Sequence, residues 1–216
     1  RGTGVGSSRR SWQSVGVENG NRWARRSAGY PPTRRPHRPA PLGDGRLFSA
    51  ALLGPSVTAD LRLRRYESTD GDRVLTLERE ALEAVDARPD EEGWTDDLRA
   101  VEETYLDPGG EFLVGELDGE IVAMGGLKPI DGETAEMTRM RVDPDHHRRG
   151  FGEAVLADLE ATATRLDYGE LLLETTARQR AAQGLYEKHG YERTDARERG
   201  RFEVLTYRKS LDGASR

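Results

Sequence analysis

The chain has 216 residues, 33% of them charged, and a formal net charge of −6. That length accommodates one full domain with an appendage. With no cysteine and only four histidines, the composition excludes a disulfide framework, a thiolate nucleophile and Cys-ligated metals, and we expect no metal site. No stretch approaches the roughly 20 apolar residues of a membrane span. We therefore expect a cytoplasmic protein without a membrane partner.

Charge divides the chain into two parts. Residues 1–49 contain ten arginines, no lysine and two carboxylates, a net charge of +8, whereas residues 50–216 carry a net charge of −14. The first part also has too few large apolar residues to build a core. We predict a basic, Arg/Pro/Gly-rich disordered extension over residues 1–56 and a folded domain over residues 57–216. An arginine-rich arm that binds nucleic acid is the weaker interpretation of the first part.

Hydrophobic periodicity and turn residues predict the elements of the folded domain. Their order along the chain is βααβββαβαββ. In that order we expect strand 61–66, helices 68–89 and 95–106, strands 111–116, 120–127 and 136–142, a helix to residue 166, strand 171–173, helix 178–189, and strands 191–194 and 202–208. The Asp118-Gly119 turn predicts that strands 111–116 and 120–127 form a β-hairpin. The charged run 197–201 is expected to be a polar loop.

The segment from Met140 to Leu156 points to an anion-binding site. It reads as a strand, a bend, a basic glycine turn and then a helix. Such a turn aims unpaired backbone N–H groups, at the positive end of the helix dipole, toward a ligand, and a pyrophosphate fits that arrangement. Gly150 and Gly152 would allow the backbone to approach closely. A dinucleotide-binding fingerprint is excluded, because Val155 stands where a third small residue is required.

Residues 142–152, which read Val-Asp-Pro-Asp-His-His-Arg-Arg-Gly-Phe-Gly, resemble the acetyl-CoA pyrophosphate loop of the Gcn5-related N-acetyltransferase (GNAT) family, usually written Gln/Arg-x-x-Gly-x-Gly/Ala. His147 stands where Gln or Arg is usual. Residues 179–191 are similar to the family's Asn-x-x-Ala-x-x-Leu-Tyr-Glu-Lys-x-Gly-Phe signature, with Gln179 in place of Asn. The resemblance covers about residues 60–211 and is strongest over 136–191.

The resemblance implies the GNAT fold, in the α/β (α+β) class, with a mixed central sheet and helices on both faces. It also implies acetyl-CoA as co-substrate and transfer of the acetyl group to a primary amine by direct attack in a ternary complex. The pantetheine arm would lie along strand 136–142, in an opening between it and strand 170–176. The residues implied to bind acetyl-CoA are Met140, Arg141, Val142, His147, Arg148, Arg149, Gly150, Phe151, Gly152, Glu153 and Gln179.

Two catalytic groups are expected. The resemblance makes Tyr186 the proton donor to the departing CoA thiolate, although its helical spacing also fits plain core packing. Because the attacking amine must be neutral, a general base is needed. Glu136 is the favoured candidate for this base, and Glu174, across the opening, is the weaker one. His146 and His147 are interpreted as an anion-contacting or exposed turn, since no third metal ligand lies at a useful spacing.

A catalytically inactive acyl-CoA-binding sensor of the same fold is the alternative function. The acceptor stays open between small-molecule and peptide amines. The net charge of −14 on residues 50–216 favours a cationic acceptor through electrostatic steering. Nucleic acid is not the expected partner, and a homodimer is compatible with the sequence.

Overall fold

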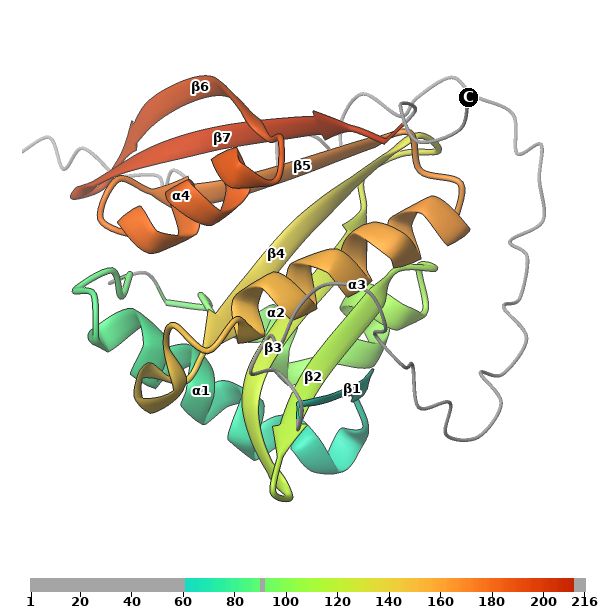
Figure 1. The fold of residues 1–216 in the computed structure, drawn as a ribbon, viewed down its shortest axis with the longest axis vertical. Helices are drawn as coiled ribbons and strands as arrows, with labels where there is room; N and C mark the ends of the chain where they lie inside the picture. Colours follow the sequence, from blue (N-terminus) through green and yellow to red (C-terminus); the bar gives the residue numbers. More distant parts are fainter. Residues whose placement is uncertain (1–60, 90–91, 212–216) are drawn as a thin grey trace, which may run out of the picture. The chain divides into compact units, whose positions relative to one another are not determined.

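The computed structural model describes residues 61–89 and 92–211, so the extension predicted over residues 1–56 lies outside the described residues. A seven-stranded sheet has the order β1-β2-β3-β4-β5-β7-β6 (Figure 1). Its strands are β1 (Arg62–Arg65), β2 (Glu111–Leu117), β3 (Glu120–Pro129), β4 (Thr134–Val142), β5 (Glu170–Thr176), β6 (Glu192–Arg199) and β7 (Phe202–Ser210). The α-helices are α1 (Gly71–Glu83), α2 (Asp96–Arg99), α3 (Phe151–Arg165) and α4 (Arg180–Lys188). None of the helices in these ranges is long and apolar enough to cross a membrane.

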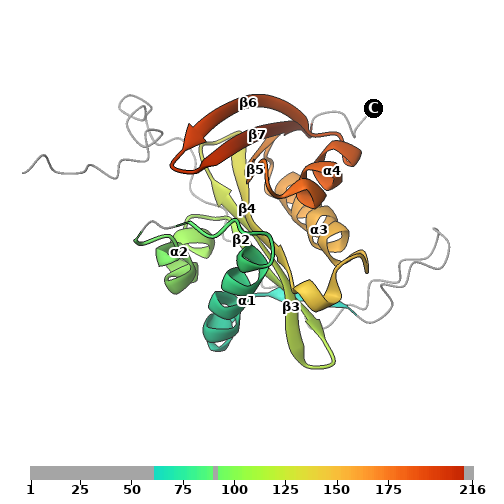
Figure 2. The same cartoon turned by 90° about the vertical axis from the view of Figure 1, so that its left-hand side faces the viewer.

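Helices cover both faces of the sheet, as expected, and each face has its own apolar core (Figure 2). On one face, α3 packs its buried stripe against the sheet, and Tyr186 of α4 joins the same core. On the other face, α1 and the turns after it bury a second core that includes Val74, Leu77 and Tyr105. The buried stripe of α1 also holds one carboxylate, Glu78, four residues after Val74 and four before Leu82.

Strands β4 and β5 form the sheet's parallel pairing, and this pairing is short. It runs from Thr134 opposite Glu170 to Met137 opposite Leu173 and then stops. Both strands continue beyond that point, β4 for five residues and β5 for three. In Figure 1 the two strands diverge there. The predicted opening between strands 136–142 and 170–176 is thus a parting of two neighbouring strands.

A β-bulge interrupts β4 next to this parting. Arg139 and Met140 stand opposite a single residue of β3, Gly125, and Arg139 has the left-handed φ of 55°. Glycine suits the facing position, because an added Cβ at Gly125 would lie 2.8 Å from atoms of both Val155 and Leu159 on α3. The bulge also shifts the alternation of β4, since Met140 still packs with the α3 core while Arg139 turns to the α1 face.

The second predicted helix, 95–106, is wrong as one continuous helix. The chain forms the short α2, breaks at Ala100, and continues as a π-helical turn, η2 (Glu102–Leu106). The break lets the Tyr105 hydroxyl donate a hydrogen bond to the Asp97 carboxylate. A regular helix would hold these two residues about 12 Å apart along its axis. The hydrogen bond between Tyr105 and Asp97 therefore overrides the helical pattern of the sequence.

The prediction that residues 197–201 form a polar loop is also wrong. Residues 197–199 belong to the edge strand β6, which pairs with β7 along its whole length, and only residues 200–201 form the turn. Every residue of β6 is exposed. A strand without a buried face has no alternation of apolar residues to read, and edge strands are commonly charged. Backbone pairing with β7 therefore defines this strand, and its side chains give no signal of it.

Candidate active site

The glycine turn before α3 presents a run of backbone donors. Gly150 begins the helix with a φ of 81°, a left-handed conformation that favours glycine, and Arg148 has a φ of 62°. Within the described residues, the backbone N–H groups of 148–153 donate no hydrogen bond, and the first that does is Ala154, to the Gly150 carbonyl (3.0 Å). These six donors lie at the positive end of the α3 dipole. The turn therefore has the free backbone donors that an anion site requires, and anion binding itself stays a prediction.

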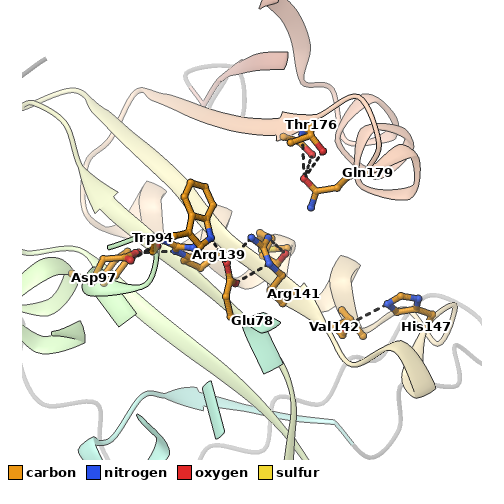
Figure 3. Close-up of polar contacts among 12 residues, drawn as sticks. Glu78, Trp94, Asp97, Arg139, Arg141, Val142, His147, Thr176 and Gln179 are labelled. Carbon is orange, nitrogen blue, oxygen red and sulfur yellow. Dashed lines mark hydrogen bonds and ion pairs between the residues drawn. The ribbon is translucent and has the colours of Figure 1, made fainter. Parts of the chain in front are cut away.

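Side chains around the turn brace it. The Asp143 carboxylate accepts a hydrogen bond from the Asp145 N–H (3.0 Å) and another from Nη2 of Arg73 on α1 (2.7 Å). His147 lies with Nε2 3.1 Å from the Val142 carbonyl, so this nitrogen carries the proton (Figure 3). Arg149 stacks its guanidinium 4.8 Å from the centre of the Phe151 ring. Of the predicted basic residues, His147, Arg148 and Arg149 are all exposed, and His147 supports the turn through its hydrogen bond to Val142.

Two further residues predicted to bind acetyl-CoA have side chains that bind other residues of the chain. Glu153 at the start of α3 pairs with Lys188 (2.9 Å) and with His189 at the end of α4, and the Lys188 hydrogen bond is the main cause that lowers its pKa. The Gln179 side-chain oxygen accepts hydrogen bonds from the backbone N–H and the hydroxyl of Thr176 (Figure 3). Glu153 can therefore contribute its backbone N–H to the glycine turn before α3. Gln179 instead stabilises the separate turn between β5 and α4.

The edge of β4 that faces the parting presents backbone groups of Met140 and Val142. The Asp143 N–H donates to Val122 on β3, so alternation turns the Val142 backbone groups away from β3. Both carbonyls already accept side-chain donors, Met140 from Arg141 (2.8 Å) and Val142 from His147. Any ligand along this edge would therefore find N–H groups more readily than carbonyls.

Tyr186 of α4 has a buried ring and an unpaired hydroxyl. Its ring packs with Tyr191 and Tyr207, with centroids 5.8 and 6.2 Å apart, and the residue is 5% exposed. In the described part of the chain its hydroxyl has no hydrogen-bond partner, yet that oxygen is not wholly buried. Burial raises the pKa of Tyr186 to about 12, against the opposing charge of Arg141. The phenol thus keeps its proton at neutral pH and can donate it.

The two candidate bases differ in their surroundings. Glu136 makes no hydrogen bond or ion pair within residues 61–89 and 92–211, and burial, followed by repulsion from Glu174, raises its pKa. Glu174 is instead bound by Arg197 of β6 through two hydrogen bonds of 2.5 and 2.9 Å. Both oxygens of Glu174 are thus occupied by a guanidinium, whereas those of Glu136 are available to an incoming amine. The geometry therefore favours Glu136.

An ionic network behind β4 was not predicted from the sequence. Glu78 of α1, 1% exposed, accepts hydrogen bonds from Arg139 (2.6 Å) and Arg141 (3.0 Å), as Figure 3 shows. Burial alone would raise the pKa of Glu78, but the two guanidinium groups outweigh it and hold the pKa below its ordinary value. A carboxylate on the apolar stripe of α1 was the available signal, since a buried charge needs a partner.

Known proteins resemble this chain in sequence and in fold. It is 30% identical over 104 residues to N-acetyltransferase 8 of Homo sapiens (45% of this chain, 46% of the relative). It is 36% identical over 159 residues to mycothiol acetyltransferase of Beutenbergia cavernae (70% of this chain, 52% of the relative). The chain thus spans about half the length of these curated relatives. A Salmonella typhimurium protein solved with its cofactor acetyl-CoA superposes with a TM-score of 0.59 at 21% identity, covering 73% of this chain and 97% of that one.

These likenesses carry different weight. At 21% identity the structural match shows the fold alone, and it confirms the predicted mixed sheet with helices on both faces. The family model described as the acetyltransferase (GNAT) family matches residues 73–191, which is more than half of the chain and includes the glycine turn, β4 and α4. The chain belongs to the GNAT acetyltransferase family.

Proposed function

We propose that this chain is an acetyl-CoA-dependent N-acetyltransferase, which transfers the acetyl group to a primary amine by direct attack in a ternary complex. The observation that carries the proposal is the run of unpaired backbone N–H groups over residues 148–153, at the start of a 15-residue helix. A pyrophosphate supplies acceptor oxygens and negative charge to such donors. Membership of the family points to the same donor substrate.

The residues present fit acetyl-CoA. The N–H groups of residues 148–153 would hold the pyrophosphate, with the exposed Arg148 adding positive charge. The fold itself makes no demand for glycine at position 152, because a Cβ there would make only ordinary contacts of 3.5 Å with Val142 and 3.6 Å with Leu185. A ligand that lies against the backbone would make that demand. The free edge of β4 beyond Met137 would hold the pantetheine arm.

The chain's own groups supply a base and an acid. Acetyl-CoA, the proposed donor substrate, provides the acetyl group as a thioester: its carbonyl carbon gains a bond to the amine nitrogen and loses its bond to sulfur. Glu136 would take the proton that the amine loses, directly or through water, which its raised pKa favours. Tyr186 would give its proton to the departing sulfur. A backbone N–H at the β4 bulge, where pairing with β3 is interrupted, would stabilise charge on the thioester oxygen.

The acceptor is proposed to be a cationic amine, either a small molecule or a peptide. The net charge of −14 on residues 50–216 supports this by steering cations toward the protein. The pairing of Glu174 with Arg197 leaves the unpaired Glu136 as an acidic group beside the parting. The folded-domain boundary near residue 57 and the cytoplasmic location stay predictions, which limited proteolysis and cell fractionation would test.

Two measurements test the proposal. Calorimetry should detect acetyl-CoA binding to the full chain, and a panel of primary amines should release free CoA thiol in the presence of at least one amine. Binding without thiol release for any amine would favour the acyl-CoA sensor instead. No binding of acetyl-CoA or free CoA would contradict both functions and leave the glycine turn without a ligand.

A further inference from the structure

The bulge of β4 is held by a side chain that the proposed reaction does not use. We propose that Arg139 is a positioning residue: its buried guanidinium holds the bulge in the conformation that presents backbone N–H groups to the acetyl carbonyl. This inference rests on the proposed function, since it concerns the site of the thioester. It assigns a task to the ionic network behind the sheet, which lies on the opposite side of β4 from α3 (Figures 2 and 3).

The backbone at Arg139 does not favour this conformation by itself. Its φ of 55° lies in the left-handed region, which glycine adopts readily but which is disfavoured for arginine and other residues with a Cβ. Such a conformation persists only when the surrounding structure imposes it. Contacts of the surrounding residues must therefore compensate for the backbone strain at Arg139.

The side chain of Arg139 provides those contacts. It is 9% exposed and donates to Glu78 of α1 (2.6 Å), to both oxygens of Asp97 of α2 (2.9 and 2.7 Å) and to the Trp94 carbonyl (2.6 Å). The guanidinium also lies 4.8 Å from the centre of the Trp94 ring. A planar guanidinium with paired donors fixes direction as well as charge. Two segments, α1 and α2 with the turn that leads into it, thus hold the side chain of one bulge residue.

The bulge and the network depend on each other. Ala135 and Met137 point into the α3 core, so regular alternation would direct both Arg139 and Arg141 into that core too. The extra residue at the bulge reverses the alternation and brings both guanidinium groups to Glu78. An unpaired guanidinium in an apolar core would be prohibitively unfavourable. The charges at this site balance, with two guanidinium groups facing the two carboxylates of Glu78 and Asp97.

This arrangement controls the site because of where the bulge lies. Pairing of β4 with β5 stops at Met137, and the bulge begins two residues later. The backbone between Met137 and Val142 therefore lies free on its β5 side. At the bulge its pairing with β3 is also interrupted, and there the Arg139 side chain holds it from the α1 face. A shift of about 1 Å in such a group can cost ~100-fold in rate. Arg139 would thus act on the reaction without touching a substrate.

Infrared spectroscopy of bound acetyl-CoA carrying ¹³C at the carbonyl tests the inference. In the wild-type chain the carbonyl band should move to lower frequency than in free acetyl-CoA, because a fixed N–H polarises the bond. Arg139→Gln should lose most of that shift and about 10- to 100-fold in kcat, with little change in acetyl-CoA affinity, since residues 148–153 are untouched. Arg139→Gly should retain more of the shift than Arg139→Gln, because glycine tolerates the positive φ and Arg141 still draws β4 toward Glu78.

A matched control separates this role from loss of a salt bridge. Arg64 makes a bidentate pair with the buried Asp70 near β1, far along the sheet from β4. Arg64→Gln should lower stability and leave the carbonyl band unchanged. If Arg139→Gln does not fold, Asp97→Asn with Arg139→Gln removes the carboxylate that has lost its guanidinium partner, while Glu78 keeps Arg141, and should restore a measurable protein.

Three results would overturn the inference. They are an unchanged carbonyl band in folded Arg139→Gln, equal loss in the Gly and Gln variants, which would indicate a direct effect of the charge, and a changed band in Arg64→Gln. Failure of the proposed function would look different, since the wild-type chain would then show no bound acetyl-CoA at all. In that case the intraresidue amide-to-Hα cross-peak of residue 139, strong at positive φ, reads the bulge in the ligand-free protein. That cross-peak should weaken in Arg139→Gln, and an unchanged cross-peak would contradict the inference.

Discussion

The two sides of β4 are built in opposite ways. On the α3 side the site is made of backbone, with six N–H groups of the glycine turn left without partners in the described chain. On the α1 side it is made of side chains, where Glu78, Asp97, Arg139 and Arg141 are buried or half-buried and paired. The first side is ready for an anion, whereas the second is already satisfied. We infer that acetyl-CoA is bound by backbone groups of one short segment. The geometry at its reacting carbonyl is set by contacts between residues far apart in the sequence.

The largest expected effect comes from the proposed base, Glu136, which alternation with Ala135 and Met137 places on the α1 side of β4. Glu136→Gln removes the proposed base and should lower kcat by about 100- to 10,000-fold, with acetyl-CoA affinity unchanged. In the wild-type chain, activity should fall as the pH drops through the pKa of Glu136, which burial places above that of an exposed glutamate. Glu174→Gln is the matched control and should change kcat much less, because Arg197 already holds that carboxylate. Equal losses in the two variants would remove the distinction between them.

The next effect breaks the backbone side alone. Gly150→Val should weaken acetyl-CoA binding by at least about 100-fold, because charge-assisted hydrogen bonds contribute about 1.5–3 kcal/mol each and valine resists the φ of 81°. Gly109 has a φ of 95° and open space around it, so Gly109→Val imposes the same kind of backbone strain outside the glycine turn. Calorimetry should find near wild-type acetyl-CoA affinity in Gly109→Val. Comparable affinity in folded Gly150→Val would contradict the anion site.

A smaller effect tests whether Tyr186 is more than a packing residue. Tyr186→Phe should lower kcat by roughly 100-fold or less, since acid catalysis gives ~100-fold or more and a thiol of pKa about 8.5 already leaves readily. The loss should shrink for acyl donors with a more acidic thiol. Tyr191→Phe removes a neighbouring hydroxyl that interacts with Glu160 and should leave kcat unchanged. A wild-type kcat in Tyr186→Phe at every pH would show that Tyr186 serves only to pack the core.

The smallest effect is on stability. Because the folded-state pKa of Glu136 is raised, protonated Glu136 favours folding at low pH, and this contribution is lost as the pH rises through the folded pKa. Glu136→Gln should therefore raise the melting temperature at neutral pH, by a few degrees at most, and the gain should vanish in acid. Thermal melts of both proteins between pH 4 and 8 would check this. A melting temperature lowered at neutral pH would show that the carboxylate is stabilised by a partner.

The fold and the glycine turn could be predicted from the sequence, because both depend on local patterns, while acetyl-CoA binding at that turn stays a prediction. The glycine turn followed by a helix can be read within a dozen residues, and Gly150 indeed has the left-handed conformation that the turn requires. The second half of β6 and the break at Ala100 were missed, since pairing with β7 and the reach of Asp97 to Arg139 are tertiary effects. Glu136 and Tyr186 stay predictions about catalysis, whatever their surroundings.

The bulge left a trace in the sequence that was overlooked. Residues of β4 that pack toward α3 are Ala135, Met137, Met140 and Val142, so one interval of three interrupts intervals of two. Read with strict alternation, Arg139 and Arg141 would occupy buried positions. Two arginines on a buried face are a warning that the alternation changes between them and the preceding residues. Their partner Glu78, 61 residues away from Arg139 in sequence, could not be identified by any local rule.

The short pairing of β4 with β5 also bears on how the domain folds. Strands β2, β3 and β4 follow one another through short turns, and β6 and β7 form a hairpin, so both groups can form from contacts between near neighbours in sequence. Strand β5 pairs with β7 and so belongs to the second group. In the described chain, four residue pairs join β5 to β4 of the first group, through a crossover that contains α3. Such non-local parallel contacts form slowly. Hydrogen exchange should therefore find the amides at this junction protected last during refolding, after those of the two antiparallel groups.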